Sequence, residues 1–222
     1  MQIHEGLKQD FYHVLVLGNQ GLNFILHLLM HSLPLTYNDH TLFHMLRHFE
    51  SIHEPAQNCL FERGYKPAAI NAALALPGSR FHASFAQDLK QLEQQMQLGV
   101  KQTIPSNPGY QHWQICFDKQ QFPNGIGTLG VVPLADLDNM GARNLMQKMN
   151  RGILMQHATV DVLPISWEMS VVVKQQKNYY LLITAFPGIP SMPLPKLYLE
   201  TEFNSACRLY WNSHVFLEIA KG

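Results

Sequence analysis

The spacing of apolar residues changes near residue 100. The segment 81–100, FHASFAQDLKQLEQQMQLGV, carries apolar residues at helical spacing with glutamines on the opposite face. After the polar, proline-containing stretch VKQTIPSNPGYQ (100–111), apolar and polar residues alternate, as in YQHWQICF (110–117). The chain is therefore expected to divide into a helical region, residues 1–100, and an antiparallel α+β region, residues 101–222.

The sequence predicts four further helices in the first region. Their segments are LKQDFYHVLVL (7–17), NQGLNFILHLLMHSL (19–33), HTLFHMLRHFESI (40–52) and KPAAINAALAL (66–76). Asn38 or Asp39 is placed to cap the third, because a short polar side chain accepts hydrogen bonds from the free amides of a first turn. Pro67 suits the first turn of the fourth, where a missing N–H leaves no bond unmade.

Strands dominate the prediction for the second region. After YQHWQICF they are TLGVVPL (128–134), ATVDVL (158–163), WEMSVVVKQ (167–175) and YYLLITAF (179–186), all rich in residues that favour strands. A turn at 175–178 makes the last two antiparallel neighbours, and helices are expected at 135–151 and 203–219. The predicted fold class is α+β: a helical N-terminal half followed by a small antiparallel sheet packed by helices.

Composition narrows the possible classes of function. Lys and Arg together number 16, as do Asp and Glu, which disfavours a strongly basic nucleic-acid binder. Cys59, Cys116 and Cys207 are far apart and form no CxxC, as expected of free thiols in a reducing compartment. The first residues do not resemble a signal peptide, and the apolar stretch 22–35 is too short to span a bilayer. We expect a cytoplasmic protein with no membrane partner.

The histidines gather in the first region. His27 and His31 are spaced i, i+4, and three more, His40, His44 and His48, follow at the same spacing. On a helix each set shares one face, within reach of a common metal ion. Neither set carries HExxH, and an amphipathic helix with histidines at the border of its core shows the same pattern. A histidine-rich metal site is therefore the third of three hypotheses, and the leading prediction includes no metal and no cofactor.

The second region contains a glycine-rich loop. FPNGIGTLGVVPLADL (122–137) contains GxGxxG at Gly125, Gly127 and Gly130. A dinucleotide-binding fingerprint follows a strand and opens a helix, whereas this one precedes a strand. We expect instead a loop in which backbone approaches backbone, or backbone approaches a phosphate.

Candidate catalytic residues also lie in the second region. Arg143 and Arg151 fall on or just after the predicted helix 135–151. His157 begins the next strand and Thr184 lies near the end of YYLLITAF. Arginine binds phosphate oxygens and stabilises charge developing at phosphorus, and histidine titrates close to neutral pH. The alternative is a solvated helix face and a threonine paired across the sheet.

Several segments share an order with a known superfamily. They are the loop and strand FPNGIGTLGVVPL, the basic residues toward NRG (150–152), the paired strands WEMSVVVKQ and YYLLITAF, and the turn FPGIPSMPLP (186–195). This order resembles the C-terminal region of bacterial ribonuclease-toxin domains, the superfamily grouped with barnase, EndoU, the tRNA-cleaving colicins and RelE. The resemblance implies a helix-plus-antiparallel-sheet fold that cleaves RNA through the ribose 2′-hydroxyl without metal. The catalytic residues it implies are His157, Arg151 and Thr184, with Arg143 in reserve.

Two functions from different classes follow, one enzymatic and one not. The first is a metal-independent ribonuclease with RNA as its partner, and it requires the four candidate residues to converge on one cleft. The second is a non-enzymatic interaction module that holds a protein partner with its helical half or its proline-rich crossing. Such a module would expose an aromatic surface that otherwise belongs to the core: Tyr198, Phe203, Tyr210, Trp211 and Phe216.

Overall fold

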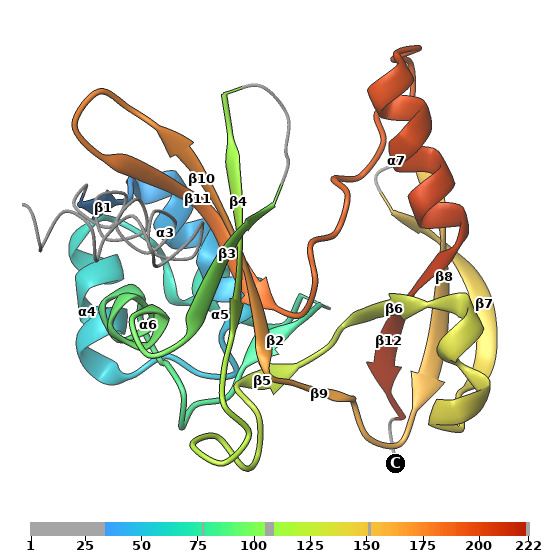
Figure 1. Cartoon of the computed structure of the whole chain (residues 1–222), viewed down its shortest axis with the longest axis horizontal. Coiled ribbons are helices and arrows are strands. Elements are labelled where there is room, and N and C mark those ends of the chain that lie inside the picture. The colour runs from blue at the N-terminus through green and yellow to red at the C-terminus, as the bar shows by residue number, and fades with distance from the viewer. Residues whose placement is uncertain (1–33, 77, 105–108, 151, 221–222) are drawn as a thin grey trace, which may run out of the picture.

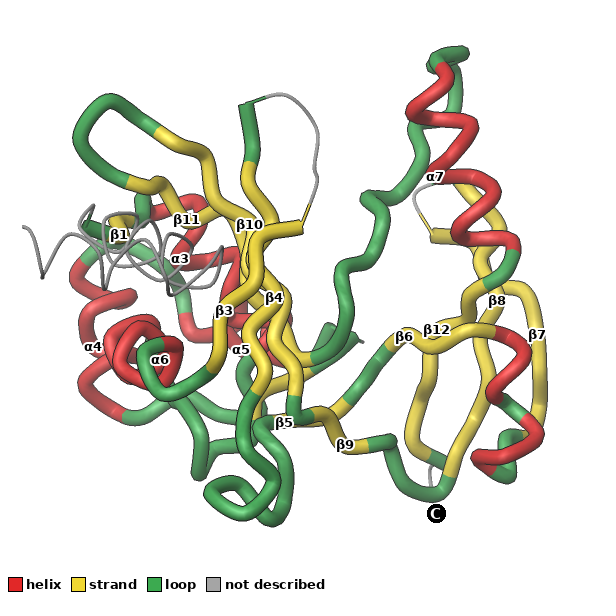
Figure 2. The backbone as a smooth tube through the Cα atoms, viewed as in Figure 1, coloured by secondary structure: helices red, strands yellow, loops and turns green. Residues whose placement is uncertain are grey.

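The structure is a computed structural model that describes residues 34–76, 78–104, 109–150 and 152–220 (Figure 1). The helices predicted at 7–17 and 19–33, with His27 and His31, lie outside the described residues, and so does Arg151. Figure 2 shows the strands gathered into a five-stranded and a four-stranded sheet, with a small three-stranded sheet between them.

The largest sheet joins strands that are far apart in the sequence. Its order is β1-β11-β10-β4-β3. The strands are β1 (Leu35–Thr36), β11 (Tyr180–Pro187), β10 (Glu168–Gln175), β4 (Gln111–Cys116) and β3 (Val100–Ile104). β1 pairs with β11 in parallel, and the other neighbours are antiparallel. The boundary predicted near residue 100 therefore falls among elements that share one sheet.

Helices cover one face of this sheet (Figure 1). They are α3 (Asp39–Met45), the 3-10 turn η1 (Leu46–His48), α4 (Glu54–Glu62), α5 (Pro67–Leu74) and α6 (Leu89–Met96). Two predicted boundaries are confirmed: the side chain of Asn38 accepts from the amide of Thr41 at 2.8 Å, and Pro67 begins α5. The apolar helix faces and the strands enclose one buried core, which includes Met45, Leu60, Leu92, Ile115 and Leu182.

The second large sheet has the order β6-β12-β8-β7. Its strands are β6 (Val131–Pro133), β12 (His214–Ile219), β8 (Ile153–Val160) and β7 (Arg143–Asn150). On one face, helix α7 (Glu202–Asn212) packs Trp211 against Met155 and Phe216. On the other, the 3-10 turns η2 (Leu134–Asp136) and η3 (Asp138–Met140) border a core with Val160 and Leu217. The connecting sheet contains β2 (Arg80–Phe81), β5 (Gly127–Thr128) and β9 (Ile165–Ser166).

The predicted fold class, a helical N-terminal half followed by a small antiparallel sheet packed by helices, is wrong. Up to residue 100 the described chain already supplies β1, β2 and the first residue of β3, and the molecule holds three sheets of five, four and three strands. The helix predicted at 81–100 is limited to α6, because Arg80 and Phe81 pair with β5. The fold is a mixed α+β structure rich in strands, with parallel as well as antiparallel pairs.

Two helix predictions in the second region are also corrected. In place of the helix predicted at 135–151, the described chain up to Asn150 forms η2, η3 and β7. Gly141 takes a left-handed φ of 61° at the end of η3, and pairing with β8 then holds the chain extended. The helix predicted at 203–219 ends at Asn212, and β12 follows because Val215 and Leu217 are buried beside β8. The predicted hairpin between β10 and β11 is confirmed.

The glycine-rich loop brings backbone against backbone, as its sequence predicts. A Cβ at Gly130 would overlap the main chain of Gly78 and Ser79, and the Gly130 amide donates to Ser79 Oγ at 2.9 Å. A Cβ at Gly127 would overlap the carbonyl of Arg80 and the ring of Pro187. These contacts fix the position of residues 78–80 relative to both large sheets.

Among the described helices, none is long and apolar enough to cross a bilayer.

The close approach at Gly130 generates a stability prediction. Gly130→Ala is expected to lower the free energy of unfolding by about 3 kcal/mol, because neither Gly78 nor Ser79 can retreat without moving β2. Gly64→Ala is the matched control: its φ of 85° strains an L residue by about 1–2 kcal/mol, but no atom lies within 4 Å of the added Cβ. Equal losses for the two variants in chemical denaturation would contradict the steric origin of the effect.

Candidate active site

A hydroxyl and two imidazoles meet where α3 and η1 pack against β11. Thr184 Oγ1 lies 3.2 Å from His44 Nε2 and 3.5 Å from His48 Nε2. The two rings stand edge to face, with centroids 5.6 Å apart. His48 is buried, whereas His44 and Thr184 are partly exposed, so solvent reaches this histidine–threonine cluster from their side.

The helix presents both histidines because one of its faces is attached to β11. Thr41 Oγ1 donates to the carbonyl of Leu182 at 2.9 Å, within the buried interface. Residues three and four positions apart share a helix face, so the turn that carries Thr41 also directs His44 toward the strand. His48 follows four residues later, in η1, and continues the same row.

The strand side of the cluster is shaped by a bulge. The register between β10 and β11 shifts between Val172 and Val173, immediately before Thr184 along β11. A bulge changes the direction in which the next side chain points and is common beside functional sites. The sulfur of Met45 contacts the two residues of β11 that follow the bulge. It lies 3.9 Å from Thr184 Oγ1 and 3.2 Å from the amide nitrogen of Ala185.

His48 is a neutral ring with a defined tautomer. Its Nδ1 lies 3.1 Å from the carbonyl oxygen of Ser79, which can only accept, so Nδ1 carries the proton. Burial, followed by the charge of Arg47, lowers the pKa of His48 to about 3. The bare Nε2 therefore accepts from the Thr184 hydroxyl, whose oxygen is in turn placed to accept from His44 Nε2. A chain of hydrogen bonds runs from His44 through Thr184 to His48.

Two guanidinium groups border the cluster. The charges of Arg47 and Arg80 both act to lower the pKa of His48. Arg80 donates to the carbonyl of Leu76 at 2.6 Å, and burial lowers its pKa while the carboxylate of Glu50 acts in the opposite direction. The field at His48 is therefore positive, which suits an anion such as a phosphate group.

Phe186 forms an apolar wall beside the cluster. Its ring packs against His48 with centroids 5.6 Å apart, and it follows Thr184 by two residues on the same face of β11. The strand ends directly afterwards, where Ser170 Oγ donates to the carbonyl of Gly188 at 2.7 Å. This sharp corner leaves Thr184 and Phe186 close to the end of the sheet.

Of the four residues predicted to act together, the three that the structure describes are not brought together. Thr184 lies in β11, within the cluster. His157 lies in β8 of the other large sheet, and Arg143 begins β7, where its exposed guanidinium pairs with Asp161. Arg151 lies outside the described residues. Arg143 and His157 lie apart from Thr184 because β7 and β8 pair in a different sheet from β11.

His157 takes part in a polar contact within its own sheet. Its Nδ1 lies 2.8 Å from Glu218 Oε1, and Lys148 Nζ lies 2.8 and 2.6 Å from the two oxygens of the same carboxylate. The hydrogen bond from Lys148 is the main cause that lowers the pKa of Glu218. The ring of His157 also stacks on Phe216, which stacks on Trp211. These contacts tie β7, β8 and β12 together, while Nε2 of the same ring is buried and has no hydrogen-bond partner among the described residues.

The regular spacing of the histidines was the sequence signal for the cluster, but the sequence did not show that Thr184 would be their partner. Spacing placed His40, His44 and His48 on one face and suggested a metal ion. In the structure His40 is exposed, and the other two face Thr184. Within the described ranges, no group of three or more His, Cys, Asp or Glu is arranged to hold a metal. Thr184 is 140 residues from His44, too distant for any local pattern to connect them.

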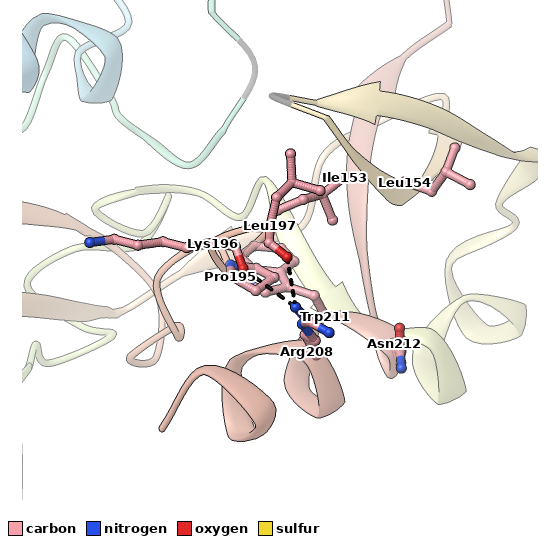
Figure 3. Close-up of a pocket in the computed structure, with 8 residues that line it drawn as sticks. All are labelled: Ile153, Leu154, Pro195, Lys196, Leu197, Arg208, Trp211 and Asn212. Carbon is pink, nitrogen blue, oxygen red and sulfur yellow. Dashed lines mark hydrogen bonds between the residues drawn. The ribbon is translucent and has the colours of Figure 1, made fainter. Parts of the chain in front are cut away.

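A cavity of about 290 Å³ lies elsewhere, between the start of β8, the crossing 195–197 and α7 (Figure 3). Its walls are largely apolar, with Leu154, Leu197 and Trp211 among them. Arg208 donates to the carbonyl of Leu197 at 3.1 Å, and the ammonium group of Lys196 points away from the cavity (Figure 3). None of the cluster residues lines this cavity, so the cavity is separate from the candidate active site.

The aromatic residues considered as a partner surface divide between core and solvent. Trp211 and Phe216 are buried, and Tyr210 stacks on His214. Phe203 is 39% exposed and Tyr198 is 95% exposed. The set therefore does not form one continuous aromatic surface.

Comparisons of the chain with protein-family models, curated proteins and solved structures found no match. Inferences about function therefore depend on the geometry of the cluster and on the residues that surround it.

The neutral state of His48 predicts a dependence of stability on pH. Because the folded ring has a pKa of about 3 and the unfolded ring about 6.5, the unfolded chain binds the proton more readily between these values, and stability falls as the pH falls. Between pH 7 and pH 5 this contributes a loss of about 2 kcal/mol. In urea denaturation at both pH values, His48→Gln should lose less stability than the wild type, whereas His40→Gln, at an exposed position, should match it. Equal losses for all three proteins would contradict a depressed pKa at His48.

Proposed function

We propose that the protein is a metal-independent ribonuclease that cleaves RNA phosphodiesters at the histidine–threonine cluster. The observation that best supports the proposal is the meeting of His44 and His48 on one hydroxyl, at 3.2 and 3.5 Å, beside Arg47 and Arg80. Attack of a ribose 2′-hydroxyl on the adjacent phosphate needs a base, an acid and fixed positive charge. Imidazoles can act as the base and the acid, and guanidinium groups supply the positive charge. In other nucleases a metal ion activates the nucleophile and stabilises the charge.

The two histidines divide the proton transfers. His48 Nε2, which is unprotonated, removes the proton of the 2′-hydroxyl as that oxygen attacks phosphorus. The bond between phosphorus and the 5′-oxygen breaks, and protonated His44 gives the proton on Nε2 to the leaving oxygen. The products are a 2′,3′-cyclic phosphate end and a 5′-hydroxyl end, with His48 protonated and His44 neutral.

Substrate binding makes His48 a stronger base than it is in the free protein. Part of the lowering of its pKa comes from the charges of Arg47 and Arg80. A bound phosphate offsets these charges, which raises the affinity of the ring for a proton. The proton therefore moves to His48 when an anionic substrate is in place.

The remaining groups of the cluster bind and orient the substrate. The hydroxyl of Thr184 donates to a non-bridging phosphate oxygen, and Arg47 and Arg80 stabilise the charge that develops on the phosphorus centre. Phe186 offers a flat apolar surface next to the phosphate, on which a base of single-stranded RNA can stack.

The proposal keeps the chemistry implied by the sequence resemblance and changes most of its residues. Thr184 is common to both assignments, whereas the histidines and arginines now come from residues 44–80 instead of 143–157. We place the activity in the cytoplasm, where RNA is available and where three free cysteines are stable as thiols.

The test is incubation of the purified protein with total RNA and with a single-stranded oligoribonucleotide in the presence of EDTA. We expect cleavage that leaves 2′,3′-cyclic phosphate ends. His44→Ala and His48→Ala should each lower the rate by about 10²–10⁴-fold, and Thr184→Val by about 10²-fold. His40→Ala is the matched control, because it changes an exposed histidine one turn earlier in α3 and should leave the rate unchanged.

Two results would overturn the proposal. One is intact RNA after incubation with the wild-type protein, and the other is cleavage that His44→Ala and Thr184→Val do not slow. A paired variant, Arg143→Ala with His157→Ala, tests the alternative assignment: if it alone abolishes cleavage, catalysis belongs to the four-stranded sheet. Thermal unfolding of every variant separates loss of chemistry from loss of fold.

A further inference from the structure

Strand β7 is an open edge of the four-stranded sheet. In the order β6-β12-β8-β7 it pairs only with β8, and no described strand pairs with its outer side. Figure 1 shows β7 at the outside of the molecule. The strand is 8 residues long. An unpaired edge of this length presents a row of N–H and C=O groups that another strand can complete.

Three of the side chains along this edge are apolar and exposed. Leu145, Met146 and Met149 are 57%, 45% and 65% exposed. Edge strands that must stay unpaired are protected by charges, by proline or by bulges, and the bulge of β7 is confined to its start, between Arg143 and Met146. The charged residue in the middle of β7, Lys148, is held by Glu218 of the same chain, so it does not leave an uncompensated charge on the edge.

The sequence of β7 is nearly the same in both directions, which suits pairing with itself. Residues 143–151 are RNLMQKMNR. If a two-fold axis passes through Gln147, antiparallel pairing sets Gln147 opposite Gln147 of the second copy and Leu145 opposite Met149 of the second copy. Apolar pairs directly opposite one another stabilise antiparallel strands. A closed two-fold interface requires a patch that is complementary to itself in this way.

We propose that two copies of the chain associate through β7, edge to edge and antiparallel, so that their four-stranded sheets form one continuous sheet. The paired stretch is residues 145–149. The register between β7 and β8 shifts between Arg143 and Met146, so Leu145 lies within this bulge and Met146 to Met149 lie in the regular ladder. On the other strand of the hairpin, Leu154 is 57% exposed and lies opposite Met149, so it extends the apolar surface on each side of the axis. The proposal does not depend on the ribonuclease activity.

The first test is the mass of the full chain by sedimentation equilibrium over a range of concentrations. We expect a dimer, twice the chain mass of 25.4 kDa. Leu145→Lys combined with Met149→Lys places like charges opposite each other twice, and should raise the dissociation constant by about tenfold or more. The matched control is Val162→Lys combined with Leu209→Lys, which alters two residues that are 78% and 70% exposed outside β7 and should leave the dimer intact.

The second test fixes the axis by a disulfide between copies. In a chain with Cys59 and Cys116 changed to Ser, Gln147→Cys should form a linked dimer under mild oxidation, because a residue on the axis meets its own copy within reach of an S–S bond. Met149→Cys alone should not, since Leu145 stands opposite. A monomer at every concentration, a dimer insensitive to the lysine pair, or linkage at 149 without linkage at 147 would each overturn the proposal.

Discussion

The attachment of α3 along β11 is the constraint on which the candidate active site depends. The bond from Thr41 to the Leu182 carbonyl and the contact of Met45 with the Ala185 amide fix both the height and the rotation of the helix on the strand. With the rotation fixed, a histidine one turn further on can only face Thr184. The site is thus a consequence of packing between a short helix and a distant strand, and small shifts of either would separate the imidazoles from the hydroxyl.

The same packing makes His48 unfavourable for stability in acid and useful for chemistry. Burial removes water from the ring, and the neighbouring arginines oppose its protonation, so the folded protein keeps it neutral. A neutral imidazole next to fixed positive charge is a poor ion partner but a good proton acceptor once an anion has bound. Stability lost on acidification is therefore linked to the property that the proposed reaction uses.

The sequence predicted those parts of the fold that depend on neighbouring residues. The Asn38 cap, Pro67 at the start of α5 and the hairpin between β10 and β11 all follow from local patterns. The strand β7 was missed because its residues favour a helix when isolated, and only pairing with β8 holds them extended. Thr184 and the histidine row were each singled out from the sequence, but their contact was not predicted, because residues 44 and 184 are too far apart for any local spacing to connect them.

Two buried histidines in this chain show how surroundings separate a structural role from a chemical one. His157 has the carboxylate of Glu218 on Nδ1 and the ring of Phe216 on its face, and these contacts join three strands. Its Nε2 is buried and has no hydrogen-bond partner among the described residues. His48 has a backbone carbonyl on one nitrogen, a hydroxyl on the other, and arginines that act on its charge. His157 faces the carboxylate of Glu218, whereas the charges of Arg47 and Arg80 act on His48 and favour the binding of an anion. This difference in electrostatic balance, rather than burial itself, is the reason to assign the reaction to His48 and its neighbours.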